Sequence, residues 1–243
     1  MTRRFNPFLA RIVPHLVAIG LIFACIELAL WQQDRAQEKA ALLNQWETAA
    51  TIEINSPVEL EQAPLYTEVR LTGRWDQRRH ILLDNQTRQN HPGVHVFVPF
   101  RPTGTDVIYF VNRGWQPWYR VSGEWPEYET PQGIQTIQGR LSSPPSVGFQ
   151  LGQASPLDPD QWPNLMTYFD LSRLRAVFGP DVADRVILLD PSDPAHLSKD
   201  PWPSINMGPD RHQAYAFQWL AIALAIFVIW LALSFRFYRK RHE

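Results

Sequence analysis

The chain has 243 residues, which is enough for one domain of ordinary size together with membrane anchors. Its 23 basic and 24 acidic side chains give a net charge of −1 and so exclude the strong basic excess of a nucleic-acid-binding surface. The single cysteine, Cys25, lies inside an apolar run. The remainder of the chain therefore cannot form an internal disulfide, a CxxC redox pair or a thiolate metal site.

The first apolar run, residues 12–31, has the length of a helix that spans a lipid bilayer. A cleaved signal peptide would need a small-x-small site after this run, and the run instead continues into Trp31 and two glutamines. A lipoprotein cleavage box ending at Cys25 would need a small residue where Phe23 stands. The sequence therefore predicts an uncleaved membrane anchor.

A second apolar run, residues 214–235, lies near the other end of the chain and predicts a second transmembrane helix. Arginines precede the first run, and arginines and a lysine follow the second. Because basic residues stay on the cytoplasmic side, both ends, 1–11 and 236–243, are expected in the cytoplasm. Residues 32–211 are then expected outside it, as an extracytoplasmic domain between two membrane spans.

The region between the two runs shows mainly the pattern of short strands. A polar helix is expected at 34–49, and a short helix is expected between the N-cap Asp170 and the stop Gly179-Pro180. Asp84-Asn85 indicates a turn or bulge. We predict a mainly-β (α+β), barrel-like domain, with strands at 67–71, 80–83, 94–98, 107–111, 134–141 and 185–189.

The usual signatures of enzymes are missing from the sequence: it has no GxSxG, GxGxxG, HExxH or Walker loop. His91 and His95 are four residues apart, but they lie in a Pro-Gly stretch that enters a strand. We expect them to be exposed loop histidines rather than zinc ligands. No nucleophile-and-base arrangement can be recognised, so we predict no catalytic residues and a protein that is not an enzyme.

Two stretches near the expected outer membrane surface have less general patterns. Residues 28–35 place Trp31 and Arg35 on one helical stripe, where they could contact a lipid-like ligand or serve as interfacial anchors. Residues 212–219 place His212, Tyr215 and Trp219 on one helical face. That histidine could ligate a haem iron, or it could belong to an ordinary interfacial belt of polar and aromatic side chains.

Two further stretches lie in the expected β region. Residues 92–99 form a strand that begins at a glycine and ends at a proline. Residues 111–117 end the most apolar strand with an Asn-Arg-Gly turn beside Trp115. Arg113 there is either a free hydrogen-bond donor or a satisfied arginine at a strand end.

Together these four stretches resemble the Surfeit locus 1 family of cytochrome c oxidase assembly factors. The family signatures L-G-x-W-Q-x-x-R, G-Y-x-V-x-T-P, V-N-R-G-W and H-x-x-Y-A-x-x-W occur here in that order. Residues 111–115 match the third signature in full. The first is matched in part by Leu28, Trp31, Gln32 and Arg35, and the second in part by Gly93, Val96 and Pro99. The fourth is matched at every defined position by His212, Tyr215, Ala216 and Trp219. The departures are Ala29, Val94 and Val98 in place of glycine, tyrosine and threonine.

The resemblance implies a role in oxidase biogenesis, with assistance to the delivery or insertion of haem a into the large catalytic subunit. Haem a would be bound transiently, with His212 as the iron ligand. Tyr215, Trp219 and Trp31 would line the ring, and Arg35 or Arg113 would pair with the propionates. The implied partners are the large oxidase subunit, haem a synthase and membrane lipid. The alternative is a haem-independent membrane chaperone that binds an oxidase subunit.

Overall fold

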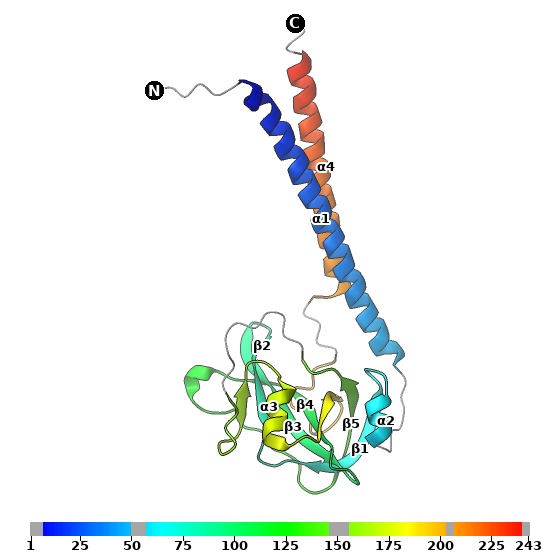
Figure 1. The fold of residues 1–243 in the computed structure, drawn as a ribbon, viewed down its shortest axis with the longest axis vertical. Helices are drawn as coiled ribbons and strands as arrows, with labels where there is room; N and C mark the ends of the chain where they lie inside the picture. The colour runs from blue at the N-terminus through cyan, green and yellow to red at the C-terminus, as the bar shows by residue number, and fades with distance from the viewer. Residues whose placement is uncertain (1–6, 50–56, 146–155, 203–206, 240–243) are drawn as a thin grey trace. The chain divides into compact units, whose positions relative to one another are not determined.

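The computed structural model describes residues 7–49, 57–145, 156–202 and 207–239. The chain divides into two compact units: residues 1–45 together with 205–243, and residues 46–204. We call the first unit the helix pair and the second the β domain, and we describe each by itself (Figure 1).

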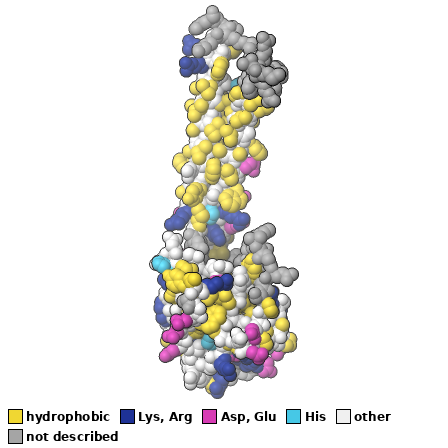
Figure 2. All heavy atoms as spheres, turned by 90° about the vertical axis from the view of Figure 1, so that its left-hand side faces the viewer, with side chains coloured by type: hydrophobic (Ala, Val, Ile, Leu, Met, Phe, Trp, Pro, Cys, Tyr) yellow, Lys and Arg dark blue, Asp and Glu magenta, His cyan; other side chains and the backbone are white. Residues whose placement is uncertain are grey.

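The helix pair consists of α1 (Pro7–Thr48) and α4 (Pro209–Arg239), which run in opposite directions. Both helices are long and apolar enough to cross a membrane, and hydrophobic side chains cover much of their surface in Figure 2. The predicted spans 12–31 and 214–235 thus lie inside longer helices. α1 runs on through the predicted polar helix at 34–49, since this segment contains no proline or glycine to stop it.

The two helices pack along a narrow seam, in which buried and half-buried residues recur every three or four positions. This average of 3.5 residues keeps one stripe of each helix turned toward the other. Small residues in the middle of the seam allow the close approach that packing in lipid requires. The seam residues are Ala18, Ile22, Cys25, Ala29 and Gln32 on α1, and His212, Ala216, Trp219, Ala223, Ile226 and Trp230 on α4.

The β domain contains seven strands, two short helices and one 3₁₀ turn among its described residues. The helices are α2 (Pro57–Gln62) and α3 (Leu171–Phe178), and the 3₁₀ turn is η1 (Arg120–Ser122). The strands are β1 (Glu68–Trp75), β2 (Ile81–Arg88), β3 (His91–Pro102), β4 (Ile108–Pro117), β5 (Gln135–Ser142), β6 (Asn164–Met166) and β7 (Val182–Leu189).

Five of these strands form a barrel-like sheet in the order β1–β5–β7–β4–β3, which closes because the last residues of β3 pair with β1. β2 pairs with the first half of β3 and carries β6 on its other edge, so the sheet extends beyond the barrel. The pairs β4–β7 and β2–β6 are parallel, and the others are antiparallel. The predicted mainly-β, barrel-like domain between two terminal helices is confirmed.

Side chains on the two faces of the sheet fill two separate cores. On β3, Val94, Val96 and Val98 enter one hydrophobic cluster together with Trp75 of β1, and Phe97 enters the other. The alternation follows from the two-residue repeat of a strand. The second cluster packs beneath α3, whose Leu174 is fully buried.

The six predicted strands and the short helix are confirmed, but β2 and β4 run five and six residues beyond their predicted ends. The Asn-Arg-Gly turn expected at the end of the apolar strand is wrong, because residues 112–114 lie inside β4. The N-cap Asp170 accepts a hydrogen bond from Ser172 N at 2.9 Å, and α3 ends before Gly179. Asn85 has a φ of 59° beside a register shift in the β2–β3 pairing, as expected of a bulge. Three elements were not predicted: α2, the 3₁₀ turn η1 and the three-residue strand β6.

The expectation that His91 and His95 are exposed loop residues is wrong. Both lie in β3, and only His91 is exposed. His95 is half-buried, its Nδ1 contacts the side-chain amide of Asn112, and burial lowers its pKa. No group of three or more potential metal ligands occurs among the described residues.

Candidate functional site

His212 occupies the first turn of α4, and its imidazole is enclosed in the seam with 7% of the residue exposed. Its Nδ1 lies 2.7 Å from Oε1 of Gln32 on α1. A side-chain carbonyl oxygen only accepts hydrogen bonds, so Nδ1 carries the proton and Nε2 carries the lone pair of the neutral ring. Nε2 has no hydrogen-bond partner among the described residues and is not sealed away from solvent.

Three of the predicted site residues lie on one flank of the seam. In an antiparallel pair, the residues that directly precede seam positions point to the same side of both helices. Trp31 precedes Gln32, and Tyr215 precedes Ala216. Arg35, one turn after Trp31, places its guanidinium carbon 5.8 Å from the centre of the indole ring. All three side chains are exposed on the helix pair, so they border an open surface rather than a core.

Trp219, the other predicted aromatic residue, belongs to the seam itself and is half-buried. It follows His212 by seven residues, so the two share the stripe that faces α1. The three residues that were predicted to share one helical face therefore do not all face α1. His212 and Trp219 enter the seam, and Tyr215 lies beside it.

A second interhelical hydrogen bond joins the other ends of the two helices. Trp230 Nε1 donates to His15 Nδ1 at 2.8 Å, with the rings nearly perpendicular. His15 and Gln32 are 17 residues apart on α1, which corresponds to about 26 Å along a helix. This length approaches the hydrocarbon thickness of a bilayer. His15 and His212 therefore cannot ligate the same ion within the pair.

Arg113 belongs to the β domain and is almost completely buried, with 2% exposed. Its Nε donates to Ala195 O at 2.8 Å and its Nη2 to Glu129 O at 2.7 Å. Its Nη1 donates to Thr130 Oγ1 at 3.1 Å. The guanidinium also lies 5.5 Å from the ring centre of Trp75. Every nitrogen of the guanidinium is thus engaged inside the domain.

The residues around Arg113 hold the chain segment that follows β7. Leu197 N donates to Arg113 O at 2.7 Å, and Trp115 N donates to Ser198 Oγ at 3.2 Å. Gly114 has a φ of +102°, and a Cβ placed there would lie 2.7 Å from His196 Cε1. Strand β4 therefore clamps residues 195–198. These residues belong to the stretch 190–209, which contains five prolines and which we call the return segment.

Burial shifts the pKa values of three side chains near residues 195–198. It lowers the pKa of Arg113 to about 10 and raises the pKa of Tyr128, whose ring lies beside the guanidinium, to about 12. Burial, reinforced by the charge of Lys199, lowers the pKa of His196 to about 4. His196 Nδ1 accepts from Lys199 N at 2.9 Å, while its Nε2 is buried without a partner among the described residues. These groups keep their ordinary charge states at neutral pH.

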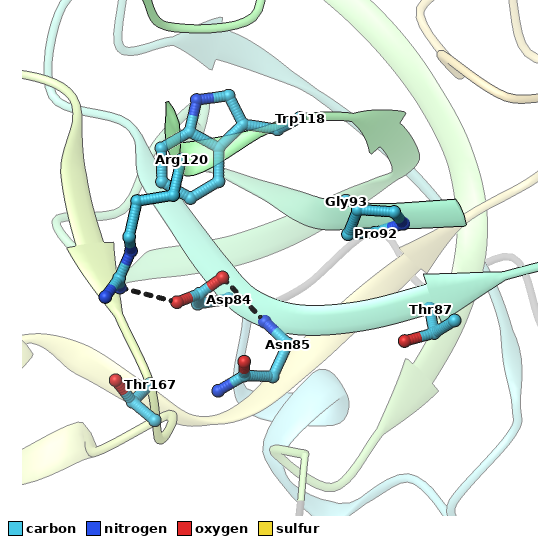
Figure 3. A pocket seen from close by; sticks show the side chains of 8 residues that line it. All are labelled: Asp84, Asn85, Thr87, Pro92, Gly93, Trp118, Arg120 and Thr167. Carbon is cyan, nitrogen blue, oxygen red and sulfur yellow. Dashed lines mark hydrogen bonds and ion pairs between the residues drawn. The ribbon is translucent and has the colours of Figure 1, made fainter. Parts of the chain in front are cut away.

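The β domain also has a polar cavity of about 520 Å³ (Figure 3). Arg120 and Asp84 form an ion pair of 2.8 Å at its wall, beside the ring of Trp118. Gly93, from the predicted strand stretch 92–99, lines the cavity as well. None of the predicted haem-site residues is among its described lining residues.

Gln32 was not among the predicted site residues, although it matches a family signature. A signal was present in the sequence: Gln32 continues the 3.5-residue series of small side chains from Ala18 through Cys25 and Ala29. A polar amide in such a series is expected to face the neighbouring helix and to need a partner there. Arg113, in contrast, was predicted as a site residue and is used inside the β domain.

Comparison with known proteins agrees with the sequence signatures. The model of the SURF1 (Surfeit locus 1) family matches residues 19–224, a range that includes the β domain and parts of both long helices. The chain is also 21% identical to a SURF1-like protein of Caenorhabditis briggsae, over 89% of this chain and 74% of that relative. Because the family match covers most of the sequence, this chain belongs to the SURF1 family.

Proposed function

We propose that this protein is a membrane-bound assembly factor for cytochrome c oxidase that carries haem a to the large catalytic subunit. The SURF1 family is known for cytochrome c oxidase assembly, and this chain has the family signatures from end to end. In the proposal haem a is a cargo that is bound transiently and passed on. The protein itself catalyses no reaction.

The observation that carries the haem proposal is the state of His212. Haem iron takes a neutral imidazole nitrogen as axial ligand. The hydrogen bond to Gln32 engages Nδ1 and leaves the Nε2 lone pair available at the end of the seam. Among the described residues no thiolate competes for this role outside the membrane, because Cys25 is buried in the middle of the seam.

The surroundings of His212 suit an amphipathic ring. Trp31 and Tyr215 offer exposed aromatic surfaces on one flank of the seam, and Trp219 lies within it. Arg35 forms an ion pair with Glu38 at 2.7 Å in which both side chains are about half exposed. Such a surface pair is weak, so a propionate can replace the glutamate at little cost.

Arg35 is therefore our choice for the propionate partner. Arg113 has the same chemistry, but its donors are already engaged by Ala195, Glu129 and Thr130. Freeing a buried guanidinium would leave those acceptors unpaired, which costs about 1–3 kcal/mol for each group. We assign Arg113 to the scaffold of the β domain.

The basic residues at both chain ends support an orientation with both termini in the cytoplasm. The β domain then lies in the periplasm of a bacterial cell, and the His212 end of the helix pair lies at the outer surface of the inner membrane. Haem a synthase would supply the cargo, and the large oxidase subunit would receive it.

The test uses the full-length protein purified in detergent from cells that make haem a. Wild type is expected to retain haem a, measured by its visible spectrum and by analysis of the extracted haem. His212→Ala is expected to be produced at normal levels and to lose most of the haem. His15→Ala, which removes the histidine near the other end of the two helices, is the matched control and is expected to retain it. If His212→Ala keeps an unchanged spectrum, His212 is not the iron ligand.

One observation favours the alternative of a haem-independent chaperone. The segment around η1 exposes three apolar side chains, and Val121 at its tip is 98% exposed. Exposed apolar groups of this kind often mark protein-binding surfaces. Two results together would favour the haem-independent chaperone over the haem carrier. Wild type would never retain haem a when it is supplied, and a Val121→Ser variant would fail to support oxidase assembly.

A further inference from the structure

Gln32 is a polar residue in a seam that consists mostly of small and apolar side chains. Its position is fixed by the 3.5-residue repeat that runs through Cys25 and Ala29, so its amide has little freedom to leave the seam. A polar group at a helix–helix contact in lipid is expensive unless it finds a partner. Its partner is Nδ1 of His212, at 2.7 Å.

We propose that Gln32 is a positioning residue that holds His212 in the Nδ1–H tautomer, so that Nε2 is presented to the haem iron. The proposal rests on the haem-carrier function above and adds the device that makes His212 a ligand. Histidines that bind metals commonly donate their second ring N–H to a carbonyl or carboxylate, which fixes the ring and raises its basicity. The carbonyl oxygen of Gln32 supplies this acceptor.

His15, at the other end of the two helices, provides an internal comparison. Trp230 Nε1 can only donate, so His15 Nδ1 accepts and the proton of the neutral ring lies on Nε2. The same pair of helices therefore holds two histidines in opposite tautomers. Only His212 has an unprotonated nitrogen that no described residue engages. The difference is set by the partner side chain, a carbonyl acceptor in one case and an indole donor in the other.

The hydrogen bond also determines how strongly the imidazole donates electrons. An acceptor on Nδ1–H makes Nε2 a better ligand, and a charged acceptor does so more strongly than a neutral one. Gln32→Glu should therefore strengthen the iron bond and lower the midpoint potential of bound haem a. Gln32→Leu keeps a similar side-chain volume without an acceptor, and it should weaken haem binding by about 10–100-fold and raise the potential.

The first experiment needs no haem. Full-length protein in detergent is labelled with ¹⁵N-histidine, and the ring nitrogen shifts of each residue are assigned with His212→Ala and His15→Ala. Wild type is expected to show protonated Nδ1 for His212 and protonated Nε2 for His15. In Gln32→Leu the His212 signals should move to the Nε2–H form or to a mixture, while those of His15 should not change. An unchanged His212 tautomer in Gln32→Leu overturns the proposal.

The second experiment measures haem a retention and midpoint potential in Gln32→Leu, Gln32→Glu and Gln33→Leu. Gln33 is the matched control because it follows Gln32 directly and its side chain is exposed. Opposite shifts of potential in the two Gln32 variants, with none in Gln33→Leu, support the proposal. Wild-type potential and retention in both Gln32 variants overturn it, even if His212→Ala loses haem. Retention of haem by His212→Ala overturns the assignment of His212 as the iron ligand instead, and a wild type that never retains supplied haem a overturns the haem-carrier function; in either case the tautomer result then stands alone.

Discussion

The β domain and the helix pair use the same kinds of side chain in opposite ways. In the β domain, Arg113 has every guanidinium nitrogen bonded to a neighbouring group and His196 is buried with a pKa of about 4. In the helix pair, Arg35 is exposed and His212 keeps one ring nitrogen free of partners among the described residues. The signature residue Arg113 of the β domain thus stabilises the fold, whereas Arg35 and His212 of the helix pair remain available to a ligand.

The largest expected effect comes from Arg113→Lys. Lysine keeps the charge, but one ammonium group cannot reach Ala195 O, Glu129 O and Thr130 Oγ1 together. With two buried acceptors unpaired, the free energy of unfolding should fall by about 2–5 kcal/mol. Denaturant unfolding of the full protein in detergent, followed by tryptophan fluorescence, measures this change.

The matched control is Arg120→Lys, since Arg120 is mostly exposed and forms one ion pair with Asp84. That pair is worth about 1 kcal/mol at most, so the variant should unfold like wild type. If Arg113→Lys is equally stable but loses haem a, then Arg113 acts as a binding residue and the contrast between the two regions fails.

Gly114→Ala should have the next largest effect. The backbone there has a φ of +102°, and an added Cβ would lie 2.7 Å from His196 Cε1 and 2.8 Å from Ser198 Oγ. Backbone strain and the displaced return segment should together cost about 2–3 kcal/mol of unfolding free energy.

Gly104 separates these two contributions. Its φ is +83°, but a Cβ would meet no atom within 4 Å, so Gly104→Ala carries the strain without the clash. We expect it to lose about 1 kcal/mol. Equal losses at the two glycines would mean that β4 does not clamp residues 195–198.

The elements that could be predicted from the sequence are those whose pattern is local. Both long helices follow from their apolar runs, and α3 follows from the Asp170 cap and the Gly179 stop. β6 could not be predicted, because its three residues become a strand only by pairing with β2. α2 is a single short segment with little periodicity of its own.

The candidate site was predictable in part for the same reason. His212, Tyr215 and Trp219 could be placed from helical spacing, but the contact between His212 and Gln32 joins residues 180 positions apart. Arg113 was predicted as a propionate partner because a guanidinium suits that role. The sequence alone does not show that the fold brings the carbonyl oxygens of Glu129 and Ala195 to this side chain, which donates to them instead.

A further effect is expected from pH. Burial lowers the pKa of His80, His95 and His196 below the ordinary value of 6.5, and that of His196 reaches about 4. Between these two values the unfolded chain binds more protons than the folded one, so stability rises with pH and falls on acidification. His196 should contribute a loss of at most about 3 kcal/mol between pH 7 and pH 4.

Unfolding of the full protein at several pH values between 7 and 4 measures this slope. His196→Gln should flatten it, because glutamine has no titrating group but can still accept the N–H of Lys199. A wild-type slope in His196→Gln would show that other groups cause the acid sensitivity.

The smallest expected effect concerns Ala29, which stands in the seam where the related signature has glycine. Its side chain is 4% exposed, so one methyl group is already accommodated between α1 and α4. Ala29→Gly removes that methyl and lowers helix propensity by about 1 kcal/mol. Ala24→Gly is the matched control on the same helix. Because Ala24 is exposed, this variant lowers helix propensity in the same way but removes no contact in the seam. Both variants should retain haem a and the Nδ1–H tautomer of His212, with Ala29→Gly slightly less stable to heat. If Ala29→Gly instead shifts the His212 ring signals, the seam rather than the carbonyl of Gln32 alone sets the position of the imidazole.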